Sequence, residues 1–313
     1  MLRDIEQYLT CPHCALGLAL DQAGRTLRCP AGHSFDVARQ GYVSLLPAGA
    51  HTGTGDTAEM VAARSDFLAA GYYEPIAAAL AEAAVAPGTP GEPGTPAGLV
   101  AGAGAGERGP VAGAGGTGPG PGLVADLGAG TGYYLARVLD ALPRAAGAAL
   151  DISKFALRRA AKAHPRAGAV VCDAWRPLPL ADGCADLVLN VFAPRNGPEI
   201  QRVLRPGGRL LVVSPTTRHL QELVGALGLL AVDEEKERRI AEKLGPWLRP
   251  LAQHRVEFEL RLSHRDAAAV VGMGPNAWHT DPAALAAALI ALPEPITVTG
   301  SVRLDIYQRS TDS

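Results

Sequence analysis

The sequence predicts an α/β protein with a mostly parallel sheet and an antiparallel edge, preceded by a small metal-binding ribbon. Three observations support this fold class. Three cysteines and a histidine gather within residues 11–33. From residue 123 onward, short apolar runs alternate with segments of helical periodicity, an order typical of parallel βαβ units. The first run ends in a glycine-rich turn at 128–132, where open α/β sheets bind their ligands.

The N-terminal cluster consists of Cys11, Cys14, Cys29 and His33, spaced as C-x2-C and C-x3-H. Two such knuckles can offer four ligands to one tetrahedral ion. Thiolates and imidazole favour zinc, whereas calcium or magnesium would need carboxylate oxygens. Two disulfides are the alternative, but the fourth group is a histidine and no signal peptide precedes the cluster. We therefore predict a zinc ribbon, which could contact a partner or merely cap the fold.

The composition limits the classes of function. The chain has 313 residues, 48% of them apolar, and a formal net charge of -2. This length allows two domains with real cores, and the near-neutral charge argues weakly against a nucleic-acid binder. The N-terminus lacks an apolar core and no apolar run approaches membrane-spanning length, so we expect a cytoplasmic protein without a membrane partner.

One segment carries basic residues at helical spacing without an acidic residue between them. A solvated helix face is the alternative to a binding surface there. These residues are Lys154, Arg158, Arg159, Lys162 and Arg166.

The chain divides by composition. Residues 57–84 have helical periodicity with a break at Gly71, which predicts two helices, whereas 86–122 are almost wholly Gly, Pro, Ala and Thr and read as a flexible insertion. The expected domains are a zinc-binding module at 1–50, a helical connection at 51–85, the insertion at 86–122 and an α/β domain at 123–313.

The α/β domain alternates strands and helices. We expect strands at 123–128, 147–153, 167–174, 185–192 and 207–215, and helices between them at 133–142, 154–164, 199–204 and 218–227. Residues 254–263 and 296–308 alternate with period two, as an antiparallel pair at one edge of the sheet would.

The glycine-rich turn identifies a cofactor class. Asp126, Gly128, Gly130 and Gly132 end the first strand just before a helix, and glycines let the backbone approach a ligand closely. A dinucleotide site has its last glycine three residues after the second, but that residue is Tyr133. The observed pattern instead resembles motif I of class I S-adenosylmethionine-dependent methyltransferases.

Further residues at strand ends agree with that resemblance. Asp151 ends the second strand, where the family's acid accepts hydrogen bonds from the ribose hydroxyls, and Asp173 ends the third, near the adenine amino group. The segment "VLRPGGRLLVV" (203–213) is similar to the turn before the family's fifth strand. Each aspartate alone could be a helix N-cap, but the ordered set favours a cofactor site.

Taken together, the two halves resemble the RlmA-type 23S rRNA (guanine-N1-)-methyltransferases over nearly the full length. The similar stretches include "CPAGHSFDVARQGYVSLL", "GDTAEMVAARSDFLAAGYYEPI", "DLGAGTGYY", "NVFAPRN" and "SPTTRHLQEL". "NVFAPRN" is most similar to the tylosin-resistance subtype. The resemblance implies N1 methylation of a guanosine in hairpin 35, at position 748 rather than 745, macrolide resistance, RNA recognition by the zinc module, and a homodimer.

The resemblance also implies site residues. It assigns Cys11, Cys14, Cys29 and His33 to zinc. It assigns contacts with S-adenosylmethionine to Tyr73, Asp126, Gly128, Gly130, Thr131, Gly132, Tyr133, Asp151, Asp173 and His219. The insertion departs from the family, whose members have a shorter connection there.

Methyl transfer from a sulfonium is an in-line displacement, so alignment and exclusion of water can supply most of the catalysis. Because guanine N1 carries a proton, a base or a group that stabilises O6 would help. Asn190, Arg195 and Asn196 follow the fourth strand, and Arg195 could hold O6 or a phosphate. Asp186 is a candidate base by position alone, and a solvent-exposed acid at the start of a strand is the favoured alternative. Trp278 and His279 could stack on a splayed base, or the Trp could be a core residue.

Two other functions remain open from the residues. A small-molecule methyltransferase of antibiotic biosynthesis would have an apolar lid instead of a basic groove. A non-catalytic RNA-binding protein would not need the complete set of strand-end acids and glycines.

Overall fold

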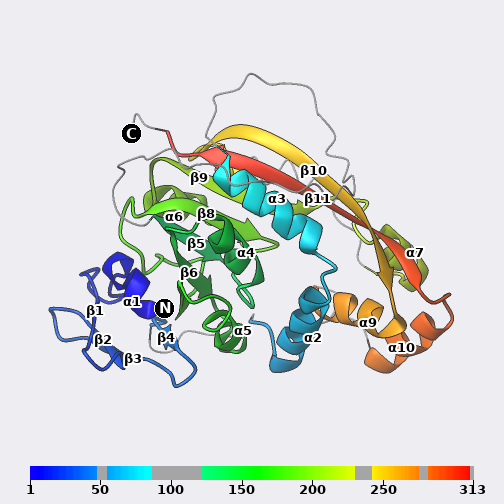
Figure 1. Cartoon of the computed structure of the whole chain (residues 1–313), viewed down its shortest axis with the longest axis horizontal. Coiled ribbons are helices and arrows are strands. Elements are labelled where there is room, and N and C mark those ends of the chain that lie inside the picture. The colour runs from blue at the N-terminus through cyan, green and yellow to red at the C-terminus, as the bar shows by residue number, and fades with distance from the viewer. Residues whose placement is uncertain (48–54, 87–121, 230–241, 275–280, 311–313) are drawn as a thin grey trace, which may run out of the picture.

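The computed structural model describes residues 1–47, 55–86, 122–229, 242–274 and 281–310 (Figure 1). Its large sheet contains β4 (Tyr42–Ser44), β5 (Leu123–Leu127), β6 (Ala146–Asp151), β7 (Ala167–Val171), β8 (Ala185–Val191), β9 (Leu204–Pro215), β10 (Arg249–Leu262) and β11 (Ile296–Gln308). The strand order is β10-β11-β9-β8-β5-β6-β7-β4. A small antiparallel sheet contains β1 (Ala19–Leu20), β2 (Thr26–Arg28) and β3 (Ser34–Asp36).

The helices of the described residues are α1 (Leu2–Ile5), α2 (Ala58–Ala69), α3 (Glu74–Val85), α4 (Tyr133–Ala141), α5 (Lys154–Ala160), α6 (Gly197–Val203), α7 (Gln221–Leu227), α9 (His264–Gly272) and α10 (Pro282–Ile290), with a 3-10 helix at Glu6–Tyr8. Side-chain caps begin several of them. Thr57 accepts a hydrogen bond from the Met60 N–H and Ser153 from the Ala156 N–H, which satisfies donors that a first turn leaves unpaired.

The predicted parallel arrangement is confirmed. β5 pairs in parallel with β6 and β8, β6 with β7, and β8 with β9. These strands are short and apolar because both faces are covered. Every residue of β5 and β7 is buried, which accounts for their continuous apolar runs in the sequence.

The sheet separates two apolar cores. Successive residues of a strand point to opposite faces, so Val124 packs with α3, α4 and α5, whereas Leu123 and Ala125 pack with α1, α6 and the zinc-binding segment. The N-terminal segment therefore shares a core with the large sheet, and it lies beside the β4 edge of that sheet (Figure 1).

The two edges of the sheet differ in strand direction. At one edge, β10 pairs with β11 and β11 with β9, all antiparallel, as the period-two patterns predicted. At the other edge, β4 pairs in parallel with β7. We did not predict β4, because three residues are too short a run to show a period.

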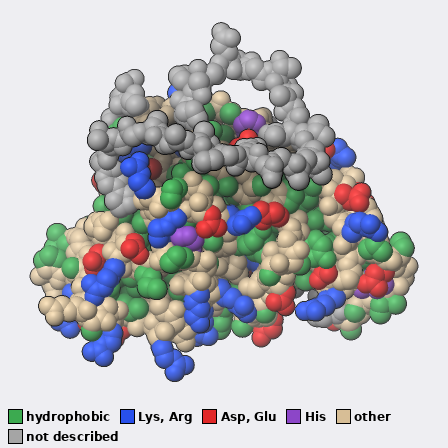
Figure 2. All heavy atoms as spheres, in the orientation of Figure 1, with side chains coloured by type: hydrophobic (Ala, Val, Ile, Leu, Met, Phe, Trp, Pro, Cys, Tyr) green, Lys and Arg blue, Asp and Glu red, His purple; other side chains and the backbone are tan. Residues whose placement is uncertain are grey.

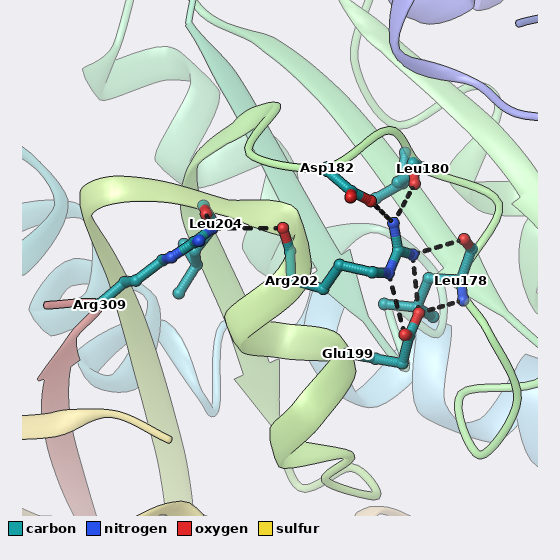
Figure 3. A network of polar contacts seen from close by, with 7 residues as sticks. All are labelled: Leu178, Leu180, Asp182, Glu199, Arg202, Leu204 and Arg309. Carbon is teal, nitrogen blue, oxygen red and sulfur yellow. Dashed lines mark hydrogen bonds and ion pairs between the residues drawn. The ribbon is translucent and has the colours of Figure 1, made fainter. Parts of the chain in front are cut away.

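Arg202 of α6 links that helix to the connection between β7 and β8 (Figure 3). Its guanidinium pairs with Glu199 and Asp182 and donates to the carbonyls of Leu178 and Leu180. The hydrogen bonds that Arg202 donates to the Glu199 carboxylate raise its pKa above the ordinary value, against a smaller opposing effect of burial, and the hydrogen bond to Asp182 adds to the rise. The network fixes the connection that leads into the amino end of β8.

Several predicted boundaries differ from the structure. The helix expected at 154–164 ends at Ala160, and the strand expected at 207–215 begins earlier, at Leu204. α9 and α10 had no counterpart in the prediction. The predicted insertion at 86–122, apart from its two end residues, and the candidate residues Trp278 and His279 lie outside the described residues.

Candidate active site and metal centre

A cavity of about 750 Å³ lies at the carboxyl ends of the central strands. Its lining comes from α2, the glycine loop after β5, the segment after β8, the start of α7 and the end of α9. Predicted site residues that line it are Tyr73, Asp126, Gly128, Gly130, Thr131, Tyr133, Arg195 and His219. Predicted site residues outside its lining are Gly132, Asp151, Asp173 and Asn190.

The glycine loop has little room for side chains. Gly128 has φ +76° and a Cβ there would lie 2.4 Å from the Cβ of Ala193. Gly132 caps α4 with φ +78°, and its Cβ would lie 3.0 Å from the Cα of Ala160. Only glycine adopts such backbone without strain, so the loop sequence follows from the close approach of the β8 segment and α5.

Asp151 holds the glycine loop in place. Its Oδ2 accepts a hydrogen bond from the Gly130 N–H at 2.8 Å, and its Oδ1 accepts one from the Ser153 N–H at 2.8 Å. Each carboxylate oxygen has a second acceptor site, so Asp151 can also receive ligand hydroxyl groups.

Asp126 is buried at the end of β5 with 1% of its surface exposed. Burial and, to a smaller extent, the charge of Asp151 raise the pKa of its carboxyl to about 8. Its Oδ2 has no hydrogen-bond partner among the described residues. A buried acceptor without a donor is costly, so this oxygen is suited to a cationic or N–H group of a ligand.

Asp173 lies just beyond β7 and faces its own loop. Its Oδ1 accepts from the Trp175 N–H at 2.9 Å, and its Oδ2 lies 3.6 Å from Nε of Arg176. These contacts explain why Asp173 is outside the cavity lining. Its contact with adenine stays a prediction.

Tyr73 and His219 meet inside the cavity although 146 residues separate them in the chain. Nδ1 of His219 accepts from the Ser301 N–H at 3.2 Å, so the neutral ring carries its proton on Nε2. Nε2 then donates to the Tyr73 hydroxyl at 3.0 Å, which leaves the tyrosine O–H proton for an acceptor. The ring centroid of Phe192 lies 6.1 Å from that of Tyr73 and 6.0 Å from that of His219.

The end of β8 and the segment after it bring the predicted candidate residues to different places. Asn190 is fully buried, and its Nδ2 donates to the Pro194 carbonyl at 2.8 Å, a contact that holds the loop. Asn196 similarly donates to the Ala174 carbonyl at 3.1 Å. Arg195 alone of these lines the cavity. Burial lowers its pKa, and the charge of Asp305 opposes this.

Arg195 can meet an anionic group in the cavity. Its Nε is buried and has no hydrogen-bond partner among the described residues. A catalytic role for Asn190 stays a prediction, since its described contacts position backbone.

The predicted candidate base is likewise engaged elsewhere. Asp186 accepts from the Leu123 N–H at 2.9 Å and pairs with Arg205 at 2.5 Å, away from the cavity lining. Its position suits a structural role at the start of β8.

The ligand atoms of Cys11, Cys14, Cys29 and His33 lie within 4.8 Å of one another. The Sγ atoms of Cys14 and Cys29 are 3.7 Å apart, and His33 Nδ1 lies 3.3 Å from Cys29 Sγ. Tetrahedral zinc with ordinary bond lengths requires edges of about 3.8 Å between two sulfurs and about 3.6 Å between sulfur and nitrogen. The cysteines are unpaired, and the donor set fits zinc.

The cavity likewise fits S-adenosylmethionine. The cofactor carries a sulfonium, an ammonium, a carboxylate and two ribose hydroxyls. Asp126 offers an acceptor without a partner, Asp151 keeps free acceptor sites, and the glycine loop leaves space for close approach. Such a site can bind the methyl donor at the loop and a second substrate beside Phe192 and Arg195.

The basic segment is divided between structural and exposed residues. Arg166 donates to the carbonyls of Leu139, Leu142 and Ala145, so it caps the end of α4. Arg158 lies over the Phe155 ring. The exposed members are Lys154, Arg159 and Lys162. On the face shown in Figure 2, basic and acidic side chains are interspersed.

Two residues of the cavity were missed from the sequence. Arg64 of α2 lines the cavity, but a single arginine in a helix reads as a surface residue. Phe192 is 41% exposed and has φ +52°. A non-glycine residue in this backbone region is a structural signal of a functional turn, which the sequence does not reveal.

None of the helices among the described residues has the length and apolar composition that a bilayer span requires.

Comparison with known proteins covers both halves of the chain. The family described as "RlmA, N-terminal" matches residues 9–52, and the "Methyltransferase domain" family matches 124–208. A protein of Micromonospora griseorubida, named as a 23S rRNA (guanine-N(1)-)-methyltransferase, is 55% identical over 97% of this chain and 98% of its own. The 23S rRNA (guanine(748)-N(1))-methyltransferase of Streptomyces fradiae is 48% identical over 98% of both chains. A Bacillus subtilis relative is 31% identical over 68% of this chain and 66% of its own.

Proposed function

Since the chain belongs to the family of 23S rRNA (guanine-N1-)-methyltransferases, we propose that it methylates N1 of the guanosine at position 748, in hairpin 35 of 23S rRNA. The observation that carries this proposal is the near full-length similarity to a relative named for position 748, together with a zinc cluster and a strand-end cavity in one molecule. Similarity to the methyltransferase half alone would leave the substrate open.

The cavity provides the parts that the reaction needs. S-adenosylmethionine supplies an electrophilic methyl group when it is bound. Tyr73 and His219 present one hydroxyl donor of fixed direction, because the Ser301 N–H holds the tautomer. A half-exposed Phe192 offers a face on which a guanine can stack. Arg195 is placed to stabilise negative charge on O6 as N1 loses its proton.

The domain assignment follows the same proposal. The ribbon around Cys11 and Cys29 contacts the RNA, residues 51–85 connect it to the sheet, and 123–313 carry the chemistry. Support comes from the core that the ribbon shares with the sheet: Cys11 and Cys29 pack in the same apolar cluster as residues of the strands that carry the cavity. Lys154 and Arg159 of α5 and Lys162 just beyond this helix are exposed and can contact phosphates.

The biological role is the finer part of the proposal. Methylation at position 748 would confer resistance to macrolides such as tylosin, in the cytoplasm, by a homodimer. Its support is the resemblance to the tylosin-resistance subtype in "NVFAPRN".

The test is methyl transfer from labelled S-adenosylmethionine to 23S rRNA from a strain without this modification, with the product located by primer extension. N1 methylation blocks base pairing, so we expect one stop, at position 748. A stop at 745 would keep the chemistry and reject the position. No incorporation by protein that retains zinc and binds S-adenosylhomocysteine would reject rRNA as the substrate and favour a small-molecule acceptor.

A further inference from the structure

Arg64 is a cation of the cavity that no motif in the sequence assigned. Its side chain comes from the middle of α2 and is 25% exposed. A Cβ at Gly130 would lie 3.7 Å from Arg64 Nη1. The guanidinium therefore lies beside the glycine loop.

Two contacts hold this guanidinium in one orientation. Nη1 pairs with the carboxylate of Asp56, and Nη2 donates to the Met273 carbonyl at 2.7 Å. Arginine has five N–H donors in a planar fork, so these contacts leave donors for a ligand. A side chain already fixed by its neighbours loses little conformational entropy when it binds.

Arg64 and Asp126 both line this cavity, and both lie near enough to Tyr134 to act on its pKa. Burial raises the pKa of Tyr134 well above its usual value, and there Arg64 acts to lower it while Asp126 acts to raise it. A ligand at this place would meet a cation on one side and a carboxyl on the other. An α-amino acid group carries both complementary charges on one carbon.

The other arginine of the described cavity lining lies in a different environment. Arg195 follows β8, and the charges that act on it are those of Asp305 and Tyr307 at the end of β11 and of Arg303. Arg64 instead acts on Asp151, whose carboxylate holds the loop. The two cations thus have different charged neighbours.

We propose that Arg64 binds the α-carboxylate of S-adenosylmethionine, while the unpartnered Oδ2 of Asp126 accepts from its α-ammonium group. This inference rests on the cofactor part of the proposed function and not on the RNA target. It makes Arg64 an affinity residue for the methyl donor, and it leaves Arg195 for the nucleic acid.

The test uses ligands that differ in one group. Affinities of S-adenosylhomocysteine and of its decarboxylated analogue, which keeps the amine, are measured by calorimetry for the wild type, Arg64→Gln and Arg64→Lys. We expect Arg64→Gln to weaken the affinity for S-adenosylhomocysteine by about tenfold or more, as for loss of a charge-assisted pair. The affinity for the decarboxylated analogue should stay within about twofold of the wild-type value. Arg64→Lys should retain part of the affinity, since it keeps the charge without the fork.

The control is Arg205→Gln, which also removes an arginine paired with an aspartate but lies outside the cavity lining; it should bind both ligands as the wild type does. If Arg64→Gln weakened the affinity for both ligands equally, Arg64 would only support the fold. If it weakened neither affinity, Arg64 would not contact the carboxylate. Either result overturns the inference. Because no RNA is present, a failure of rRNA methylation would not be confused with these outcomes.

Discussion

Asp126 is a carboxyl group held away from water next to a second carboxylate. Burial and the charge of Asp151 place its pKa at about 8, far above that of a free aspartate. It is therefore largely protonated at neutral pH in the free protein. A bound cation favours the charged form, so binding and proton release are coupled at this residue.

This coupling predicts the pH dependence of cofactor affinity. Below pH 8, an ammonium group must displace the proton of Asp126, so affinity for S-adenosylhomocysteine should rise from pH 6.5 toward about 8 and then level off. Calorimetry in buffers of different ionisation enthalpy measures the released proton. Asp126→Asn should bind more weakly and lose this pH dependence; a variant that kept the wild-type profile would assign the proton to another group.

The raised pKa of Asp126 also makes the folding stability depend on pH. The folded-state pKa lies above the unfolded one, so the stability that Asp126 contributes is complete below about pH 4 and is lost as pH rises through about 8. The melting temperature of Asp126→Asn, measured without ligand, should therefore rise relative to that of the wild type as the pH increases from about 4 toward about 8.

At the scale of elements, the turn from β5 to α4 is determined by what packs against it. The loop segment after β8 and the helix α5 both approach the glycines closely. Caps such as Ser153 and the Arg202 network fix the neighbouring turns. The shape of the cavity is therefore fixed, because each of several short connections around it is bonded to or packed against another element.

Gly128→Ala tests this tight packing. The added Cβ would lie 2.4 Å from the Ala193 Cβ at a backbone φ of +76°, so the loop must shift. We expect a loss of about 1–3 kcal/mol in unfolding free energy and S-adenosylhomocysteine affinity reduced by about tenfold. Gly225→Ala, on α7 with open space around it, is the control and should be neutral or slightly stabilising. Unchanged affinity in Gly128→Ala would show that the loop tolerates displacement.

At the scale of the whole molecule, the N-terminal zinc-binding segment and the large sheet pack around one shared core. β4 extends the sheet beside β7, and α1 packs on β6 and β7. The N-terminal ammonium also donates to the Pro165 carbonyl at 2.9 Å. Metal binding near the N-terminus should therefore stabilise a sheet edge that is distant in sequence.

Removal of one zinc ligand tests this coupling. Cys29→Ser should lose its zinc, lower the melting temperature by roughly 5 °C or more, and reduce hydrogen-exchange protection in β7. Cys184→Ser changes a free cysteine outside the cluster and should keep zinc and protection. Protection of β7 that survives zinc loss would show that the ribbon folds independently of the sheet.

The sequence by itself determined the features that depend on local pattern. Residue spacing was sufficient for the zinc ligands, because knuckles are local. Apolar alternation was sufficient for the parallel sheet and its antiparallel edge. The acid and glycines of the loop follow from strand-end geometry, which parallel sheets share. The resemblance to a family added Tyr73 and His219, which no period would have marked.

Only the tertiary structure decided which of these residues share one cavity. It separated Asn190, which holds a backbone carbonyl, from Arg195, which lines the cavity. It added Arg64 and the edge strand β4. The reason is physical: burial, charge and direction of a side chain depend on contacts between segments far apart in the chain, and spacing along one segment carries no record of them.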